Sequence, residues 1–132
     1  MTNAPVRREP EWLAVDLLLA IHDRQLAEHG GGVGVCNMGA LESALARPIN
    51  RWSYGEDDII ALAATLGFGI ARNHPFIDGN KRSAWVATRL FLALNGVELS
   101  FAPADAIAAV LALAAGEIGE DELAQWLRER AL

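Results

Sequence analysis

Apolar residues recur at steps of three and four positions along most of this 132-residue chain, which is the spacing of an amphipathic α-helix. Gly30–Gly32, Pro48 and Asn95–Gly96 interrupt this pattern and are typical helix stops. The first stripe lies on one helix face: Trp12, Val15, Leu19, His22 and Leu26. The chain is therefore predicted to fold into packed helices.

The spacing and the stops together predict six helices. Their expected ranges are about 10–29, 37–47, 56–73, 79–94, 103–115 and 120–130. Asn37 is a suitable N-cap for the second helix, and Pro48 is expected to end it. Gly67 and Gly69 each cost a helix about 1 kcal/mol relative to alanine, so another backbone should pack closely beside the third helix. Residues 97–101 could form a short extended segment.

Length and composition fit a single all-α domain over residues 1–132. The apolar fraction of 52% allows a buried core. The only cysteine, Cys36, permits no disulfide within the chain and suits a reducing compartment. The N-terminus has no secretory pattern, and the longest uncharged stretch, Ile59–Ala71, is shorter than the roughly 20 residues that cross a bilayer. We therefore expect a cytoplasmic protein with no membrane partner.

The charge distribution favours a small anionic ligand. The net charge is −6, yet Arg72, Lys81, Arg82 and Arg89 share their part of the chain with a single acid, Asp78. A local basic patch in an acidic protein suits a nucleotide better than a long nucleic acid. Direct nucleic-acid binding is therefore not expected. A solvated surface without a ligand would give the same charge pattern.

The segment between the third and fourth expected helices has the features of a phosphate site. A turn containing Gly79 leads directly into the fourth helix, so the first backbone amides of that helix lack intrahelical partners and can bind an anion. Lys81, which is the only lysine, and Arg82 add full positive charges. The predicted phosphate-binding residues are Gly79, Asn80, Lys81 and Arg82.

The same segment supplies a base and a metal ligand. His74 is a candidate general base, because histidine exchanges protons near neutral pH. Asp78 can hold Mg²⁺ together with phosphate oxygens and water. These groups are typical of phosphoryl or nucleotidyl transfer. Each also has a purely structural interpretation, His74 as a helix stop and Asp78 as a turn former. Their concentration within nine residues favours catalysis.

Three further residues are expected to shape this segment. His74 precedes Pro75, which favours an extended backbone at His74. Phe76 is apolar and is expected to anchor the segment in the core. His22 lies on an apolar stripe, which is more typical of a hydrogen-bonded core histidine than of a metal ligand. Arg47 and Arg51 could face the nucleotide or the target, but the default expectation is that both are solvated.

The run His74–Arg82 resembles the signature of the Fic/Doc superfamily, His-x-Phe-x-Asp/Asn-Gly/Ala-Asn-x-Arg, at every position. The resemblance extends to residues 21–31, 41–48 and 68–73, and so covers roughly residues 12–130. It implies the Fic/Doc fold, a compact bundle of about six helices with the active-site loop between two central helices. Its catalytic residues would be His74, Asp78, Lys81 and Arg82, with ATP as substrate and Mg²⁺ bound at Asp78.

Two positions indicate the branch of the superfamily. Lys81 stands where adenylyl-transferring Fic proteins have glycine, and Trp85 stands where they have a second arginine. The Asn-Lys-Arg version resembles Doc toxins, which implies transfer of the γ-phosphoryl group of ATP to a protein hydroxyl, with elongation factor Tu as the target class and arrest of translation as the result. Two alternatives stay open: an adenylyl transferase on the same scaffold, and a non-catalytic module that only senses nucleotide.

The chain lacks the inhibitory motif Ser/Thr-x-x-x-Glu-Gly/Asn of many Fic proteins. No serine or threonine has a glutamate four residues later, and Ser53 with Asp57 comes nearest. By resemblance, the inhibitor would be a separate antitoxin, a small protein whose C-terminal segment folds into a groove.

Overall fold

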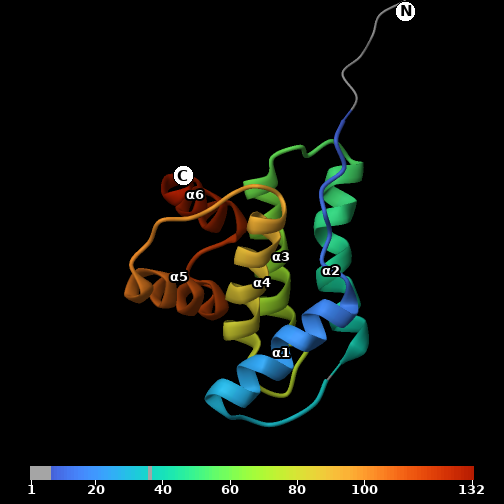
Figure 1. The fold of residues 1–132 in the computed structure, drawn as a ribbon, viewed down its shortest axis with the longest axis vertical. Helices are drawn as coiled ribbons and strands as arrows, with labels where there is room; N and C mark the ends of the chain where they lie inside the picture. The colour runs from blue at the N-terminus through green and yellow to red at the C-terminus, as the bar shows by residue number, and fades with distance from the viewer. Residues whose placement is uncertain (1–6, 36) are drawn as a thin grey trace, which may run out of the picture.

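The computed structural model describes residues 7–35 and 37–132, and Cys36 lies outside these ranges. The described chain contains six helices, which confirms the all-α prediction (Figure 1). Two isolated bridges pair Val35 with Phe76 and Leu99 with Ala131, and these ranges contain no longer strand. The helices are α1 (Val15–His29), α2 (Met38–Ser53), α3 (Ile59–Asn73), α4 (Asn80–Leu94), α5 (Pro103–Ala115) and α6 (Glu120–Arg130).

Helix α3 is the centre of the bundle and contacts α2, α4, α5 and α6. Figure 1 shows α3 and α4 side by side, with α2 on one side, α5 and α6 on the other, and α1 crossing near the end where α3 leads into α4. Between Ala61 and Ala71 every residue except Phe68 is buried. The helix is therefore apolar on all sides, as expected for a helix inside a core. No helix in the described ranges is long and apolar enough to cross a membrane.

The close approach of another backbone that the glycines of α3 predict is confirmed at Gly69, whereas the close neighbours at Gly67 are side chains. A Cβ at Gly67 would overlap Oγ1 of Thr88 in α4. A Cβ at Gly69 would lie 3.2 Å from the Cα of Ala44 in α2. Glycine at these positions lets both neighbouring helices approach α3, and this fixes the place of α4 and of the loop that precedes it.

The prediction that Pro48 ends the second helix is wrong. Helix α2 starts after the Asn37 cap, whose side chain accepts the Ala40 amide proton at 3.0 Å, and it continues past Pro48 to Ser53. A proline inside a helix costs about 3 kcal/mol. Contacts beyond it offset that cost, because Pro48 is buried and Arg51 donates to Thr65 Oγ1 of α3 at 2.7 Å.

Two helix starts also differ from the sequence-based expectation. Trp12 precedes α1 instead of lying on it, and its ring packs against Trp52 and Phe91 at centroid distances of 6.2 and 5.9 Å. Helix α3 begins at Ile59 instead of residue 56, because the Asp58 carboxylate caps it by accepting the Ile60 amide proton at 3.0 Å. A side-chain cap therefore sets the start of α3, whereas α1 begins after Ala14 without one.

Candidate active site

The loop between α3 and α4 begins at His74, which has a left-handed backbone with φ 48° and ψ 56° and caps the end of α3. The prediction of an extended backbone at His74 is therefore wrong. The chain must turn sharply at this point, because the following residue, Pro75, accepts the Asn37 amide proton at 3.2 Å. A left-handed histidine is strained, and such strain is typical of functional sites. The His74 side chain is exposed.

Phe76 and Asn80 hold the loop in shape. Phe76 is only 2% exposed, which confirms that it anchors the loop in the core. The Asn80 side chain accepts the Phe76 amide proton and donates to the Phe76 carbonyl oxygen, each at 3.0 Å. Because its amide group is used within the loop, Asn80 would meet a phosphate through its backbone N–H.

His22 supports the loop from α1. Its buried ring stacks on Phe76, with centroids 3.7 Å apart and planes inclined by 5°. Its Nε2 lies 2.7 Å from the carbonyl oxygen of Asp78. A carbonyl only accepts hydrogen bonds, so Nε2 carries the proton and donates it. The sequence-based interpretation of His22 as a hydrogen-bonded core histidine is thus confirmed.

The Asp78 carboxylate is exposed at the tip of the loop. Its Oδ1 accepts the amide proton of Gly79 at 2.8 Å, and Gly79 has a φ of +78° as the N-cap of α4. Among the described residues, no group of three or more His, Cys, Asp or Glu side chains could hold a metal ion. A metal at this site would thus depend on the Asp78 carboxylate, with phosphate oxygens and water completing the shell, which suits Mg²⁺.

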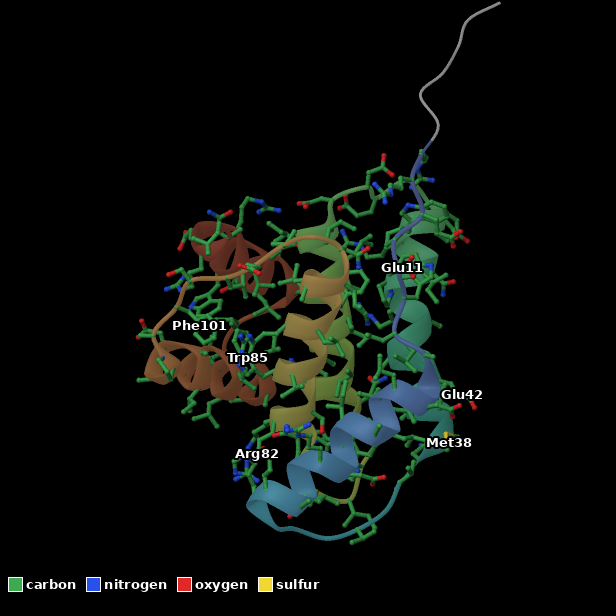
Figure 2. All side chains as sticks on the ribbon, viewed as in Figure 1. Glu11, Met38, Glu42, Arg82, Trp85 and Phe101 are labelled. Atoms are coloured by element: carbon green, nitrogen blue, oxygen red, sulfur yellow. The ribbon has the colours of Figure 1, made fainter. Side chains whose placement is uncertain are left out.

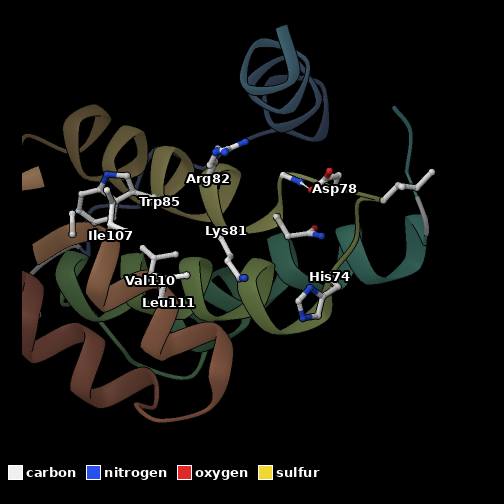
Figure 3. Close-up of a pocket in the computed structure, with 12 residues that line it drawn as sticks. His74, Asp78, Lys81, Arg82, Trp85, Ile107, Val110 and Leu111 are labelled. Carbon is white, nitrogen blue, oxygen red and sulfur yellow. Dashed lines mark hydrogen bonds between the residues drawn. The ribbon is translucent and has the colours of Figure 1, made fainter. Parts of the chain in front are cut away.

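Lys81 and Arg82 present uncompensated positive charge at the start of α4. Both side chains are exposed, and the first turn of α4 contains no acid. Neither residue takes part in the ion pairs found in the described part of the chain. Figure 3 shows Lys81 pointing to the side of His74, whereas Arg82 points toward α1. The positive end of the helix dipole adds to these charges and makes the region attractive to an anion.

All the residues predicted for catalysis and phosphate binding line one cleft between this loop and α5, with a volume of about 570 Å³ (Figure 3). The predicted members are His74, Asp78, Gly79, Asn80, Lys81 and Arg82. The structure adds apolar lining residues: Ile77 of the loop, Trp85 of α4, and an apolar wall on α5 made of Ala106, Ile107, Val110 and Leu111.

Sequence reasoning missed the contribution of α5 to this cleft. Ile107 and Leu111 are 62% and 48% exposed, although both are large and apolar. The sequence does contain a signal for this surface, which is the lack of charge in α5. After Asp105, α5 has no charged residue, even at positions that face solvent. An apolar outer helix of this kind indicates a surface that binds something.

Trp85 is fixed by aromatic neighbours. Phe101 and Trp126 meet its ring edge-on, at centroid distances of 5.2 and 5.8 Å. Figure 2 shows Trp85 and Phe101 close together beside α5, with Arg82 further along α4 near α1. The indole thus stands as a rigid part of the cleft wall, in the position where the sequence lacks a second arginine.

Arg47 and Arg51 do not line the cleft. Arg51 binds Glu56 and Thr65, and Arg47 binds Glu120 at 3.1 Å. Both arginines are half-buried instead of solvated. They join α2 to α3 and α6, and so their role is structural.

Comparison with known proteins identifies the family. The model of the Fic/DOC family matches residues 12–92. The chain belongs to the Fic/DOC family. Protein kinase doc of Escherichia phage P1 is 38% identical over 112 residues, which cover 84% of this chain and 88% of that protein. Toxin Doc of Mycolicibacterium smegmatis is 46% identical over 74 residues, which cover 54% of this chain and 56% of that protein.

The matched part of this Fic/DOC chain contains α3, the loop, and α4 as far as residue 92. The family match ends at residue 92, so α5 and its apolar wall lie beyond it. The cleft thus combines a signature loop inside the family match with an outer wall from α5.

Proposed function

We propose that this chain is a Doc-type toxin that transfers the γ-phosphoryl group of ATP to a hydroxyl group of a protein of the elongation factor Tu class, and so halts translation. The observation that carries the proposal is the position of Lys81 inside the cleft, between His74 and the apolar wall. A lysine there fills space that glycine would leave open, and it adds a charge beside the phosphates. The similarity to a relative named a protein kinase supports the same activity.

The residues of the loop have distinct roles in this proposal. His74 removes the proton from the target hydroxyl, whose oxygen then attacks the γ-phosphorus. A bond forms between that oxygen and phosphorus, the bond from the γ-phosphorus to the bridging β–γ oxygen breaks, and ADP leaves. Lys81, Arg82 and the first backbone amides of α4 stabilise the negative charge on the transferring group.

Mg²⁺ would be held at Asp78. The exposed carboxylate lines the cleft, and no described cluster competes with it for a metal ion. When bound, the ion would neutralise part of the phosphate charge. The Asp78 backbone is held by His22 and its Oδ1 by Gly79, so the carboxylate is pre-positioned for this role.

We further propose that a small antitoxin neutralises the chain through a C-terminal segment that lies in a groove. The exposed apolar face of α5 supports this, because Ile107 and Leu111 border the cleft and lack a partner within the described chain. A helix with apolar residues at steps of three and four would cover them. Such a segment, folding only when bound, would leave the free antitoxin open to proteolysis.

The product distinguishes the candidate functions. The chain is expressed in a bacterial host, elongation factor Tu is recovered, and its peptides are analysed by mass spectrometry. A phosphate on a hydroxyl side chain is expected, and it should be absent when His74→Ala is expressed instead. An adenylyl group in its place would identify the other transferase activity, and an unmodified factor in arrested cells would reject elongation factor Tu as the target.

A further inference from the structure

The glycine-rich segment Gly30–Gly34, called the glycine run below although residue 33 is valine, lies directly beside the active-site loop, and the proposed mechanism gives it no role. Ile77 donates its amide proton to the Gly34 carbonyl oxygen at 3.1 Å. Val35, which follows the run, forms an isolated bridge with Phe76. The run therefore packs beside the loop that carries Asp78.

Within the glycine run, Gly31 lies nearest to the side chain of Asp78. Its φ of +128° favours glycine. A Cβ at this position would lie 2.8 Å from Oδ2 of Asp78 and 3.1 Å from its Cγ, and it would also lie 3.1 Å from a methyl carbon of Leu26. The space that a side chain of residue 31 would need is thus occupied by the Asp78 carboxylate.

Three neighbours then confine Asp78. The Gly79 amide binds Oδ1, the His22 ring binds the backbone carbonyl oxygen, and Oδ2 lies in the space where a Cβ of residue 31 would be. The first two are hydrogen bonds that hold Asp78 in place. The third is the absence of a side chain at residue 31, which leaves room for the carboxylate. A single methyl group added at residue 31 would fill that space.

We propose that Gly31 is a positioning residue for Asp78: the missing side chain leaves the space in which the carboxylate lies. The proposal rests on the proposed function, because it matters for activity only if Asp78 serves phosphoryl transfer. An alanine at residue 31 would push the carboxylate away or shift the glycine run. A displacement of about 1 Å in a catalytic group can lower the rate by roughly a hundredfold.

Gly30→Ala is the matched control for Gly31→Ala. Gly30 lies in the same run and also has a positive φ, +75°, so alanine strains the backbone there too. However, no atom lies within 4 Å of a Cβ at Gly30. The two variants therefore share the backbone strain, and only Gly31→Ala touches Asp78.

The first measurement is independent of activity. The amide NMR signal of Gly79 reports the position of the carboxylate, because this N–H donates to Asp78 Oδ1. We expect the Gly79 signal to move in Gly31→Ala and to stay near its wild-type position in Gly30→Ala. Equal signals in both variants would overturn the proposal.

The second measurement is the Mg²⁺ dependence of transfer from ATP. Gly31→Ala should need more Mg²⁺ or lose about tenfold to a hundredfold in rate, and Gly30→Ala should stay near wild type. In the Asp78→Ala background, Gly31→Ala should have no further effect. A wild-type protein without transfer would reject the proposed function, whereas the Gly79 signal would still decide the position of the carboxylate.

If Gly31→Ala fails to fold, a second variant still tests the contact with Asp78. The double variant Gly31→Ala/Asp78→Ala lacks the carboxylate that the methyl group meets. Recovery of folding in this double variant supports the contact with Asp78. Continued failure would show that the methyl group disrupts the fold through other neighbours, and it would overturn the proposal.

Discussion

At the scale of single residues, His74 and Asp78 are placed by different means. His74 caps α3 in a left-handed conformation, and its exposed ring lines the cleft. Asp78 is held by the ring of His22 from α1 and by the backbone amide of Gly79. Strain at one residue and confinement at the other are both consistent with a site shaped for chemistry at the expense of stability.

His74→Ala should abolish transfer and leave the fold intact. A positioned general base contributes about 10²–10⁴-fold to rate, and the exposed ring contributes little packing. The rate of label transfer from ATP and the midpoint of thermal unfolding would be measured side by side. A variant with full activity would show that His74 is only the end of a helix.

Asp78→Ala should also lose activity, and added Mg²⁺ should restore it only weakly. The described chain has no cluster of acidic or imidazole side chains that could replace this carboxylate as a metal ligand. The measurement is a Mg²⁺ titration of the transfer rate in wild type and variant. Complete rescue at high Mg²⁺ would mean that another group binds the ion.

At the scale of the helices, the glycines of α3 set how closely its neighbours pack. Gly67 faces Thr88 of α4, and Gly69 faces Ala44 of α2. Alanine favours a helix over glycine by about 1 kcal/mol, so an open position would gain stability from the substitution. At a position in tight contact, the same substitution would lower the free energy of unfolding instead. The sign of the change in that free energy therefore distinguishes an open position from a tightly packed one.

Gly67→Ala should lower the free energy of unfolding by about 1–3 kcal/mol, because the added methyl group overlaps Thr88 Oγ1. In the Thr88→Ala background, which removes that oxygen, the loss should shrink. Chemical denaturation of the two single variants and the double variant measures the difference. A gain in stability from Gly67→Ala alone would contradict the packing described for α3 and α4.

Helix number and most helix ends could be predicted from the sequence, because spacing, caps and glycine stops are local. The course of α2 past Pro48 could not, since the contacts of Arg51 with Thr65 and Glu56 that offset the proline involve α3 and the segment before it. The signature loop was recognised from its residues alone. The wall from α5 and the contact between Gly31 and Asp78 were missed, because both join segments distant in the chain.

At the scale of the whole molecule, the cleft combines a cationic end with an apolar wall. Lys81 lies between His74 and the apolar wall, to which Ile107 and Leu111 of α5 belong (Figure 3). This division suits two occupants, a nucleotide at the helix start and a protein segment along α5. An antitoxin that inhibits the chain would occupy the part of the cleft along α5.

Induction of the chain alone should arrest growth of a bacterial host, and co-expression of its small antitoxin should relieve the arrest. Ile107→Lys should weaken the relief, because a charge would interrupt the apolar face of α5. Tyr54→Lys is the matched control, since Tyr54 is 93% exposed and lies outside the cleft. Normal growth with soluble, intact chain expressed alone would count against the toxin assignment.

Transfer of the γ-phosphoryl group of ATP to a protein is tested most directly with labelled ATP. Purified chain is incubated with elongation factor Tu and ATP labelled at either the α- or the γ-phosphate, with His74→Ala as the control. We expect label on the target only from γ-labelled ATP, and none with His74→Ala. Label from α-labelled ATP would contradict this expectation and would identify adenylyl transfer as the activity of this site.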